Sequence, residues 1–165
     1  MLRKYQARAT LYLVAKRDGT DWSARKKAHH DSGELAREPK LTDEQARELL
    51  AAGCVELGAH TLTHANLAQL SPAEKREEIH GSKARLESEF AVPVRSFAYP
   101  FGIWDSRDRE VAREAGFTTA VTTDPGIDPF PWPDPLAIRR VKVSGKEGFS
   151  AFRLRMRTGL RGAWK

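Results

Sequence analysis

The chain has 165 residues, of which 40% are hydrophobic and 30% charged, so its composition is that of a globular rather than a disordered protein and predicts one domain over residues 1–165. It contains no apolar run long enough to cross a bilayer, and its start lacks the apolar core and the cleavage site of a signal peptide. The single Cys54 excludes an internal disulfide framework and a zinc site made of several cysteines.

The net charge of +6 and the pI of about 9.7 are compatible with an anionic partner. Over most of the chain Lys and Arg are interleaved with Asp and Glu, as on solvated helix surfaces, which argues against nucleic acid as a partner. The final segment alone is one-sided, with basic residues Arg153, Arg155, Arg157, Arg161 and Lys165. A non-catalytic domain that binds an anionic polymer through this basic tail is therefore an alternative hypothesis.

The first third of the chain predicts two strands and one helix. Residues 9–14 form a short β-rich run, and the polar residues 16–40 predict a loop. Thr42, with Gln three positions later, begins a helix through a capping box. That helix ends at Gly53, and residues 54–57 predict the next strand.

The longest predicted helix begins after Ser71, with Pro at its first position and Glu completing a capping box. Its buried stripe consists of Ile79, Leu86 and Phe90. Pro93 lies beyond its end, and residues 94–98 predict a strand.

A further helix begins after Asp105 or Ser106 and ends at Gly116. Residues 117–121 predict another strand, and the proline-rich residues 122–135 predict a loop. Helix, glycine and short buried strand thus recur along the chain. This repetition indicates an α/β fold built of βα units around a parallel sheet.

Two histidines, His60 and His64, follow the strand that ends near Gly58. A spacing of four lets both imidazoles face one point and hold a divalent cation, and catalytic residues of parallel α/β folds gather at the carboxyl ends of strands. The alternative is a pair of ordinary surface histidines. The motif is not the metalloprotease HExxH, because Thr61 occupies the position of its glutamate and is no base.

The second unusual stretch is FAYPFG, residues 97–102. A strand that ends in a Pro-aromatic-Gly turn can point a backbone N–H group into a pocket, where it would stabilise a developing oxyanion. The alternative is an ordinary tight turn whose aromatic side chains belong to the core.

Together, HTLTH at 60–64 and PFG at 100–102 resemble the second and third motifs of the polysaccharide deacetylases, which are metal-dependent carbohydrate esterases with a distorted (β/α) barrel. The flanking stretches KYQARATLYLV, AREAGFTTAVTTDPG and LAIRRVKV resemble the poly-N-acetylglucosamine-type branch. The resemblance covers nearly the whole chain with order and spacing kept. The family is often extracytoplasmic in bacteria.

The resemblance implies a role for each motif residue. His60 and His64 would bind the metal, usually zinc, and Thr61 would support their loop by hydrogen bonding. Water activated by the metal would attack the acetamide carbonyl of an N-acetylated polysaccharide or oligosaccharide. The backbone N–H of Phe101 would hold the oxyanion. Tyr99, Pro100 and Trp104 would contact the sugar, although a partly buried core position is an equal alternative for the tryptophan.

The chain also departs from the family pattern. The Asp-Asp motif, which supplies the catalytic base and the third metal ligand, lies on the strand before the first helix, and this sequence begins inside or after that helix. The aspartates of the next loop match nothing: Asp18, Asp21 and Asp31. The arginine that often precedes the third motif is Ala98 here, and we expect Arg139 or, in our assignment, Arg140 to serve instead. The late Leu-x-His motif is not found.

We therefore expect an incomplete distorted (β/α) barrel that lacks its first, central strand and leaves sheet edges and apolar surface exposed. The expected activity is removal of N-acetyl groups from a glycan, with an inactive protein as the outcome if nothing replaces the aspartate. Three explanations stay open: an upstream true start, an inactive remnant, or a partner chain or oligomer that covers the missing strand. We favour the first, because a parallel sheet without a middle strand is hard to stabilise.

Overall fold

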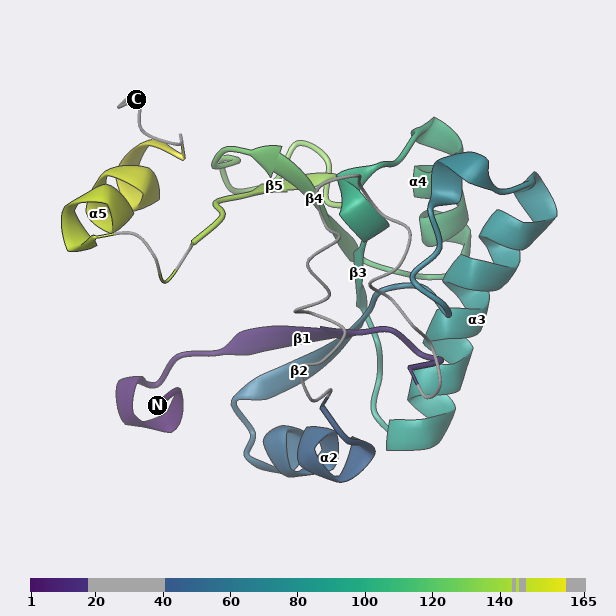
Figure 1. Cartoon of the computed structure of the whole chain (residues 1–165), viewed down its shortest axis with the longest axis horizontal. Coiled ribbons are helices and arrows are strands. Elements are labelled where there is room, and N and C mark those ends of the chain that lie inside the picture. The colour runs from purple at the N-terminus through teal and green to yellow at the C-terminus, as the bar shows by residue number, and fades with distance from the viewer. Residues whose placement is uncertain (18–40, 144, 146–147, 160–165) are drawn as a thin grey trace, which may run out of the picture.

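The structure is a computed structural model that describes residues 1–17, 41–143, 145 and 148–159. In this part of the chain five parallel strands form one sheet in the order β1-β2-β3-β4-β5 (Figure 1). The strands are β1 (Ala9–Leu13), β2 (Val55–Ala59), β3 (Ser96–Ala98), β4 (Thr119–Pro125) and β5 (Ile138–Arg140). The helices are α2 (Asp43–Ala51), α3 (Pro72–Phe90), α4 (Ser106–Glu114) and α5 (Phe149–Thr158), with short 3₁₀ turns η1 (Arg3–Tyr5), η2 (Leu67–Gln69) and η3 (Pro100–Gly102).

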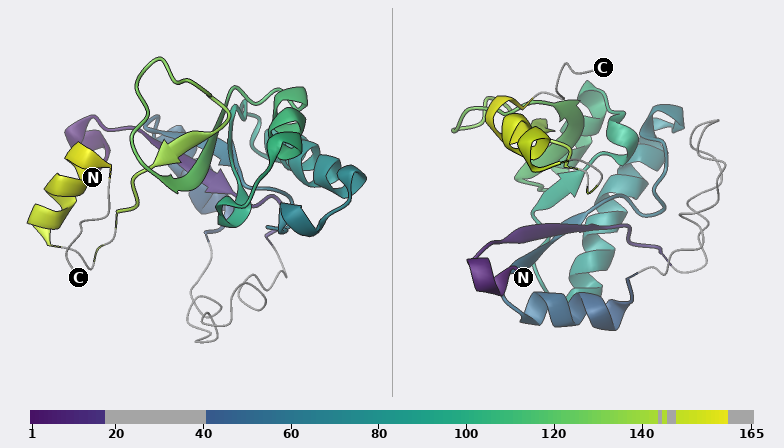
Figure 2. Two further views of the ribbon diagram at one scale, coloured as in Figure 1. Left: turned by 90° about the horizontal axis from the view of Figure 1, so that it is seen from above. Right: turned by 60° about the vertical axis from the view of Figure 1, so that its left-hand side comes forward.

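Helix α5 lies apart from the two helices that cover the sheet. Helices α3 and α4 pack side by side on one side, whereas α5 lies at the opposite end of the molecule (Figures 1 and 2). The parallel sheet and the intervening helices confirm the predicted α/β class. No helix among the described residues combines the length and the apolar content of a membrane span.

Three helix starts agree with the sequence signals. Thr42 and Ser71 each cap a helix through a complete capping box, as predicted for α2 and α3. For α4 the sequence predicts Asp105 or Ser106 as the cap, and Asp105 is the cap: its carboxylate accepts from the N–H groups of Arg107 and Asp108. These caps satisfy N–H groups that a helix leaves without an internal partner, and so they fix where each helix begins.

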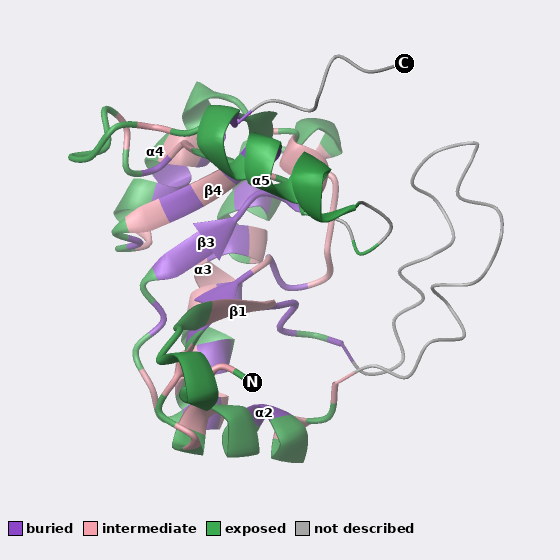
Figure 3. Ribbon diagram, turned by 90° about the vertical axis from the view of Figure 1, so that its left-hand side faces the viewer, coloured by how far each residue is buried: buried purple, intermediate pink, exposed green. Residues whose placement is uncertain are grey.

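The core lies between the sheet and α3 with α4. Ile79 and Leu86 of α3 are completely buried, as is Phe97 of β3. Figure 3 shows the buried strands at the centre and the exposed α5 on the surface. The predicted apolar stripe of α3 therefore faces the sheet.

The opposite face of the sheet carries a row of polar contacts. Tyr12, Gly58, Ser96 and Thr119 are register partners across β1 to β4. The Tyr12 hydroxyl lies 2.7 Å from Ser96 Oγ, which also accepts from Thr119 Oγ1 at 3.0 Å. A Cβ at Gly58 would lie 2.6 Å from the Tyr12 ring, so only glycine lets this ring cross the sheet.

The order of the strands differs from our expectation in one respect. We expected a gap at the centre of the sheet, but β1 to β5 are paired in sequence order without interruption. The described sheet is not closed, because β1 and β5 form its two edges. An additional strand would therefore join at an open edge, which is compatible with an incomplete barrel.

Several element boundaries also differ from the prediction. Strand β3 begins at Ser96 rather than at Val94, because the N–H of Val94 donates to Glu87 and its carbonyl accepts from Lys83. Strand β4 continues to Pro125, into the predicted loop, because it pairs with β5 as far as Arg140. The first part of the predicted basic tail is helical: it belongs to α5, whose N-cap residue is Gly148.

Candidate functional site

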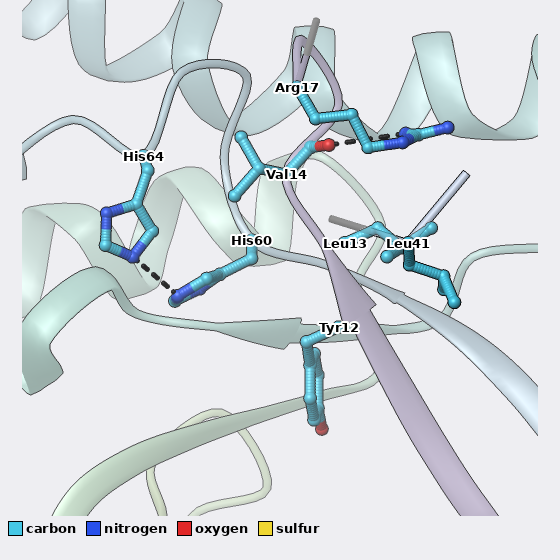
Figure 4. A pocket seen from close by; sticks show the side chains of 7 residues that line it. All are labelled: Tyr12, Leu13, Val14, Arg17, Leu41, His60 and His64. Carbon is cyan, nitrogen blue, oxygen red and sulfur yellow. Dashed lines mark hydrogen bonds between the residues drawn. The ribbon is translucent and has the colours of Figure 1, made fainter. Parts of the chain in front are cut away.

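The candidate site lies at the carboxyl end of β2, where a pocket of about 270 Å³ opens beside the two histidines (Figure 4). Its lining residues are Tyr12, Leu13, Val14, Arg17, Leu41, His60 and His64. The charge of Arg17 is already engaged, because this buried side chain forms ion pairs with Asp43 and Glu89. The pocket is therefore mainly apolar, with two imidazoles as its converging polar groups.

The imidazoles of His60 and His64 point toward each other (Figure 4). Their Nε2 atoms lie 3.0 Å apart. Nδ1 of His60 lies 2.6 Å from the carbonyl oxygen of Ala98, which can only accept a hydrogen bond. The Nδ1 of neutral His60 therefore carries the proton, and its Nε2 presents a lone pair toward the Nε2 of His64.

The loop between the histidines holds this geometry in an unusual backbone conformation. Thr61 and His64 both have φ near +63°. The buried Thr61 hydroxyl donates to the carbonyl of His60 at 2.7 Å and accepts from the N–H of His64 at 3.0 Å. From α3, Glu78 accepts from the N–H and the hydroxyl of Thr63, at 3.0 and 2.7 Å. These contacts offset the backbone strain and hold both rings in place.

The two nitrogens fit a divalent metal. Two ligands of one tetrahedral zinc ion, at a bond length of about 2.05 Å, would lie about 3.3 Å apart, close to the separation of His60 Nε2 and His64 Nε2. The described residues contain no group of three or more His, Cys, Asp or Glu side chains that would complete such a site. Asp18, Asp21 and Asp31 lie outside the described residues.

The turn η3 lies directly beside the histidines. The Phe101 ring meets the His64 ring edge-on, with centroids 4.7 Å apart at 74°. Phe101 has φ +59°, which turns its peptide away from the direction of β3. Gly102, at φ +69°, packs against Thr123 of β4 so closely that a Cβ would lie 1.8 Å from the threonine hydroxyl. The backbone of the turn is thus fixed between the sheet and the histidine loop.

The three predicted sugar contacts lie at different depths. Tyr99 is fully buried, its hydroxyl donates to the carbonyl of Leu136 at 2.9 Å, and burial raises its pKa. Trp104 is half-buried against the core and stacks on Tyr99, with ring centroids 5.3 Å apart. Pro100 is buried in the turn itself. Tyr99 and Pro100 thus support η3 from within, and only Trp104 is partly accessible.

Of the two candidate arginines, Arg140 is held against β4. Its Nε donates to the carbonyl of Thr122, and its charge acts on Tyr12. Burial raises the pKa of the Tyr12 hydroxyl, and the hydrogen bond with Ser96 and the charge of Arg140 oppose that rise. Arg139 instead pairs with Asp128 on the exposed surface.

A sequence model of the polysaccharide deacetylase family matches residues 1–120 of the chain. The chain belongs to the polysaccharide deacetylase family. Both motifs, at 60–64 and 100–102, lie within the matched residues, and the structure brings them into contact through His64 and Phe101.

Individual relatives support this assignment. The Bacillus subtilis (strain 168) protein YxkH, which carries a polysaccharide deacetylase assignment, is 28% identical over 152 residues, covering 92% of this chain and 48% of YxkH. The polysaccharide deacetylase BC0361 from Bacillus cereus has a TM-score of 0.70 at 25% identity, over 90% of this chain and 41% of that one. The Streptococcus pyogenes deacetylase PplD, in complex with acetate, has a TM-score of 0.69 at 23% identity, over 88% and 57%. This chain spans about half the length of these relatives.

The same fold also occurs in BA3943 from Bacillus anthracis, described as a CE4 family pseudoenzyme. Its TM-score is 0.52 at 23% identity, over 72% of this chain and 34% of that one. Membership of the polysaccharide deacetylase family therefore fixes the fold without deciding between an active and an inactive protein. Whether the protein is active depends on the groups present at the site.

The basic segment near the end of the described chain is partly helical and packed, and is not a free tail. Arg155 is buried and donates to the carbonyl of Lys142, whereas Arg153 and Arg157 are exposed. Arg161 and Lys165 lie outside the described residues. Binding of an anionic polymer through this segment stays a prediction.

Sequence reasoning missed two groups that position the histidines. One is the Ala98 carbonyl, which fixes the His60 ring, and the other is Glu78, which braces Thr63. A backbone carbonyl carries no sequence signal. Glu78 lies on the charged side of α3, where a glutamate is expected for solubility alone. Its contact with the histidine loop depends on how α3 packs against the end of β2.

Proposed function

We propose that the chain is a deacetylase-like hydrolase that removes acetyl groups from an N-acetylated polysaccharide or oligosaccharide with the help of a divalent cation, zinc in the first instance. The observation that supports this most directly is the convergence of His60 Nε2 and His64 Nε2 at 3.0 Å, beside the third-motif turn. Family membership supplies the reaction class. The metal and its role are our inference from the two imidazoles.

A bound cation would supply Lewis-acid chemistry, lowering the pKa of water and polarising the acetamide carbonyl. His60 and His64 would hold it, and the hydrogen bond from His60 to Ala98 would keep the correct ring nitrogen directed at it. Thr61 would preserve the loop conformation that lets both rings converge.

The Phe101 peptide is the proposed partner of the substrate oxygen. Its left-handed conformation sets the direction of its N–H, and the packing of Gly102 on Thr123 keeps that direction fixed. A preorganised N–H donor stabilises the negative charge that develops on the carbonyl oxygen without needing to reorient. Trp104 is the proposed contact for the sugar ring, supported from below by Tyr99.

Arg140 is the proposed replacement for the arginine that often precedes the third motif. Its guanidinium is held at the carbonyl of Thr122, and its positive charge acts on the hydroxyl of Tyr12 in the polar row. We propose that this charge favours the ionised form of the carboxylate that completes the site.

The carboxylate itself is proposed to come from a strand added at an open edge of the sheet. Residues of β1 alternate in the direction of their backbone groups, and the N–H of Ala9 and the carbonyl of Leu13 bond toward β2. The backbone groups of Thr10 and Tyr12 consequently face the other way and can pair with a further strand. A segment that precedes the chain or a strand from a partner chain would fit there.

The test is metal-dependent release of acetate from N-acetylglucosamine oligomers, measured with zinc and with cobalt. Sodium formate is added in a parallel series, because a small carboxylate can replace a missing catalytic carboxylate. We expect acetate release that formate increases and that disappears in His60→Ala and His64→Ala. A folded, zinc-bound wild-type chain that releases no acetate even with formate would contradict the proposal and favour a pseudoenzyme.

A further inference from the structure

Two aromatic side chains stand on the surface of the loop between β4 and β5. Phe130 is 82% exposed and Trp132 is 39% exposed. Their rings meet edge-to-face, with centroids 5.6 Å apart and planes at 87°. Large apolar groups that are gathered on a surface mark a binding site more often than single exposed residues do.

The loop that carries these rings is held firmly at both ends. Arg139 donates from its N–H and its Nε to Asp128, at 2.8 and 2.6 Å, and Arg109 of α4 donates to Asp134 at 2.8 Å. Four prolines restrict the backbone between and beside them: Pro129, Pro131, Pro133 and Pro135. A ligand that binds the rings would therefore lose little affinity to ordering of the loop.

The loop starts next to the candidate site. Thr123, near the end of β4, donates to the carbonyl of Phe101 at 3.4 Å, and the ring of Phe101 contacts His64. Figure 2 (left) shows the loop, in light green, standing out from the sheet beside β4 and β5. A series of direct contacts thus connects the histidine pocket to the start of the aromatic loop.

The charges around the rings favour a neutral ligand. Asp128 is paired with Arg139, and Asp134 is paired with Arg109, so the carboxylates and guanidinium groups flanking Phe130 and Trp132 neutralise each other. An anionic polymer or an anionic lipid surface would need unpaired basic groups at this position. A pyranose ring instead presents a face of C–H groups that packs against an aromatic ring.

We propose that Phe130 and Trp132 form a subsite that binds a hexosamine unit of the substrate glycan, outside the histidine pocket. The inference rests on the proposed function, because a polysaccharide must extend beyond the unit that reacts. The pocket of about 270 Å³ is slightly smaller than the usual small-molecule site, which measures about 300 Å³ or more, so it leaves neighbouring sugar units outside. The aromatic pair supplies an apolar surface for one of them.

The test compares glycan binding by two double variants. Phe130→Ala/Trp132→Ala removes the proposed subsite, and Phe149→Ala/Phe152→Ala removes the exposed aromatic pair of α5, whose centroids lie 6.3 Å apart, as a matched control. Calorimetry measures the affinity of each protein for the dimer and the hexamer of N-acetylglucosamine. We expect the first variant to bind the hexamer about tenfold more weakly, or about 1.4 kcal/mol, and to bind the dimer as the wild type does.

Other results contradict the inference in distinguishable ways. Hexamer binding that is unchanged in Phe130→Ala/Trp132→Ala, or that weakens equally in the α5 control, would overturn the subsite and leave the proposed function intact. A wild-type chain that binds zinc but neither oligomer would overturn the glycan substrate, and the subsite with it. Circular dichroism and a melting curve confirm that each variant is folded.

Discussion

His60 Nδ1 and the carbonyl oxygen of Ala98 lie 2.6 Å apart and join the ends of two neighbouring strands. His60 follows β2, whereas Ala98 ends β3 immediately before the turn that carries Phe101. The orientation of the imidazole is therefore set by the strand that carries the other motif. A displacement of β3 relative to β2 would weaken the hydrogen bond that fixes the orientation of the imidazole.

The Thr61 hydroxyl provides the first prediction. Thr61→Val removes the hydrogen bonds to the His60 carbonyl and from the His64 N–H but keeps a β-branched side chain at φ +63°. We expect a loss of about 1–2 kcal/mol in the free energy of unfolding, because the half-buried N–H of His64 loses its partner. Zinc affinity should fall about tenfold, as for other residues that orient metal ligands.

Thr61→Ser is the control for this variant, because it retains the hydroxyl. Urea unfolding and calorimetric zinc titration should place it near the wild type in both quantities. If the valine and serine variants bind zinc equally well, the hydroxyl does not hold the histidine loop.

The packing of Gly102 against Thr123 provides the second prediction. Gly102→Ala places a Cβ 1.8 Å from Thr123 Oγ1 at a residue with φ +69°. Gly116→Ala, after α4, introduces alanine at φ +79° with no atom within 4 Å. The control should lose about 1 kcal/mol from the left-handed conformation alone, and Gly102→Ala should lose about 3 kcal/mol or more because the clash adds to it.

Urea unfolding of the two glycine variants measures this difference directly. Because the clash displaces the turn that carries Phe101, acetate release should fall further in Gly102→Ala than in Gly116→Ala. Equal losses of stability in the two variants would show that the contact between Gly102 and Thr123 does not constrain the turn.

The cap of α4 provides a prediction about pH. A hydrogen bond from the Asp108 N–H, together with Lys75, lowers the pKa of Asp105 below its ordinary value of 3.8. A carboxylate with a lowered folded-state pKa adds stability above its unfolded pKa, and this stability is lost as the pH falls through the folded value. The free energy of unfolding should therefore decline below pH about 4 less steeply in Asp105→Asn than in the wild type.

Asparagine is itself a good helix cap, so the comparison isolates the charge. Urea unfolding at a series of pH values between about 2 and about 7 measures both slopes. Parallel curves for Asp105→Asn and the wild type would mean that the carboxylate of Asp105 does not contribute to acid unfolding.

The sequence was sufficient for the parts of the fold that depend on local signals. Thr42 and Ser71 begin helices where the capping boxes predicted them. Helix α5 was missed because Gly148 is a weak cap and three arginines lie in the helix, so the segment read as a solvated basic tail. Its anchor is the buried Arg155, which donates to a carbonyl of the preceding loop and cannot be recognised from its neighbours in sequence.

The candidate site could also be predicted from the sequence only in part. The spacing of His60 and His64 predicted a converging pair, and their Nε2 atoms are in contact. The polar row from Tyr12 to Ser96 was not predicted, because it depends on the register of strands 84 residues apart in sequence. The sequence predicted open sheet edges, which β1 and β5 form, but not the uninterrupted strand order, since strand order is a property of the whole sheet and not of any one segment.

The most direct test of the central claim is zinc binding by the purified chain, compared with His60→Ala/His64→Ala and with His80→Ala as a histidine control on α3. Equilibrium dialysis gives the stoichiometry, and competition with a chromophoric chelator gives the affinity. We predict one zinc per wild-type chain, the same in His80→Ala, and loss of that zinc in the double variant. Equal zinc affinity in the wild type and the double variant would contradict the assignment of these two histidines as metal ligands.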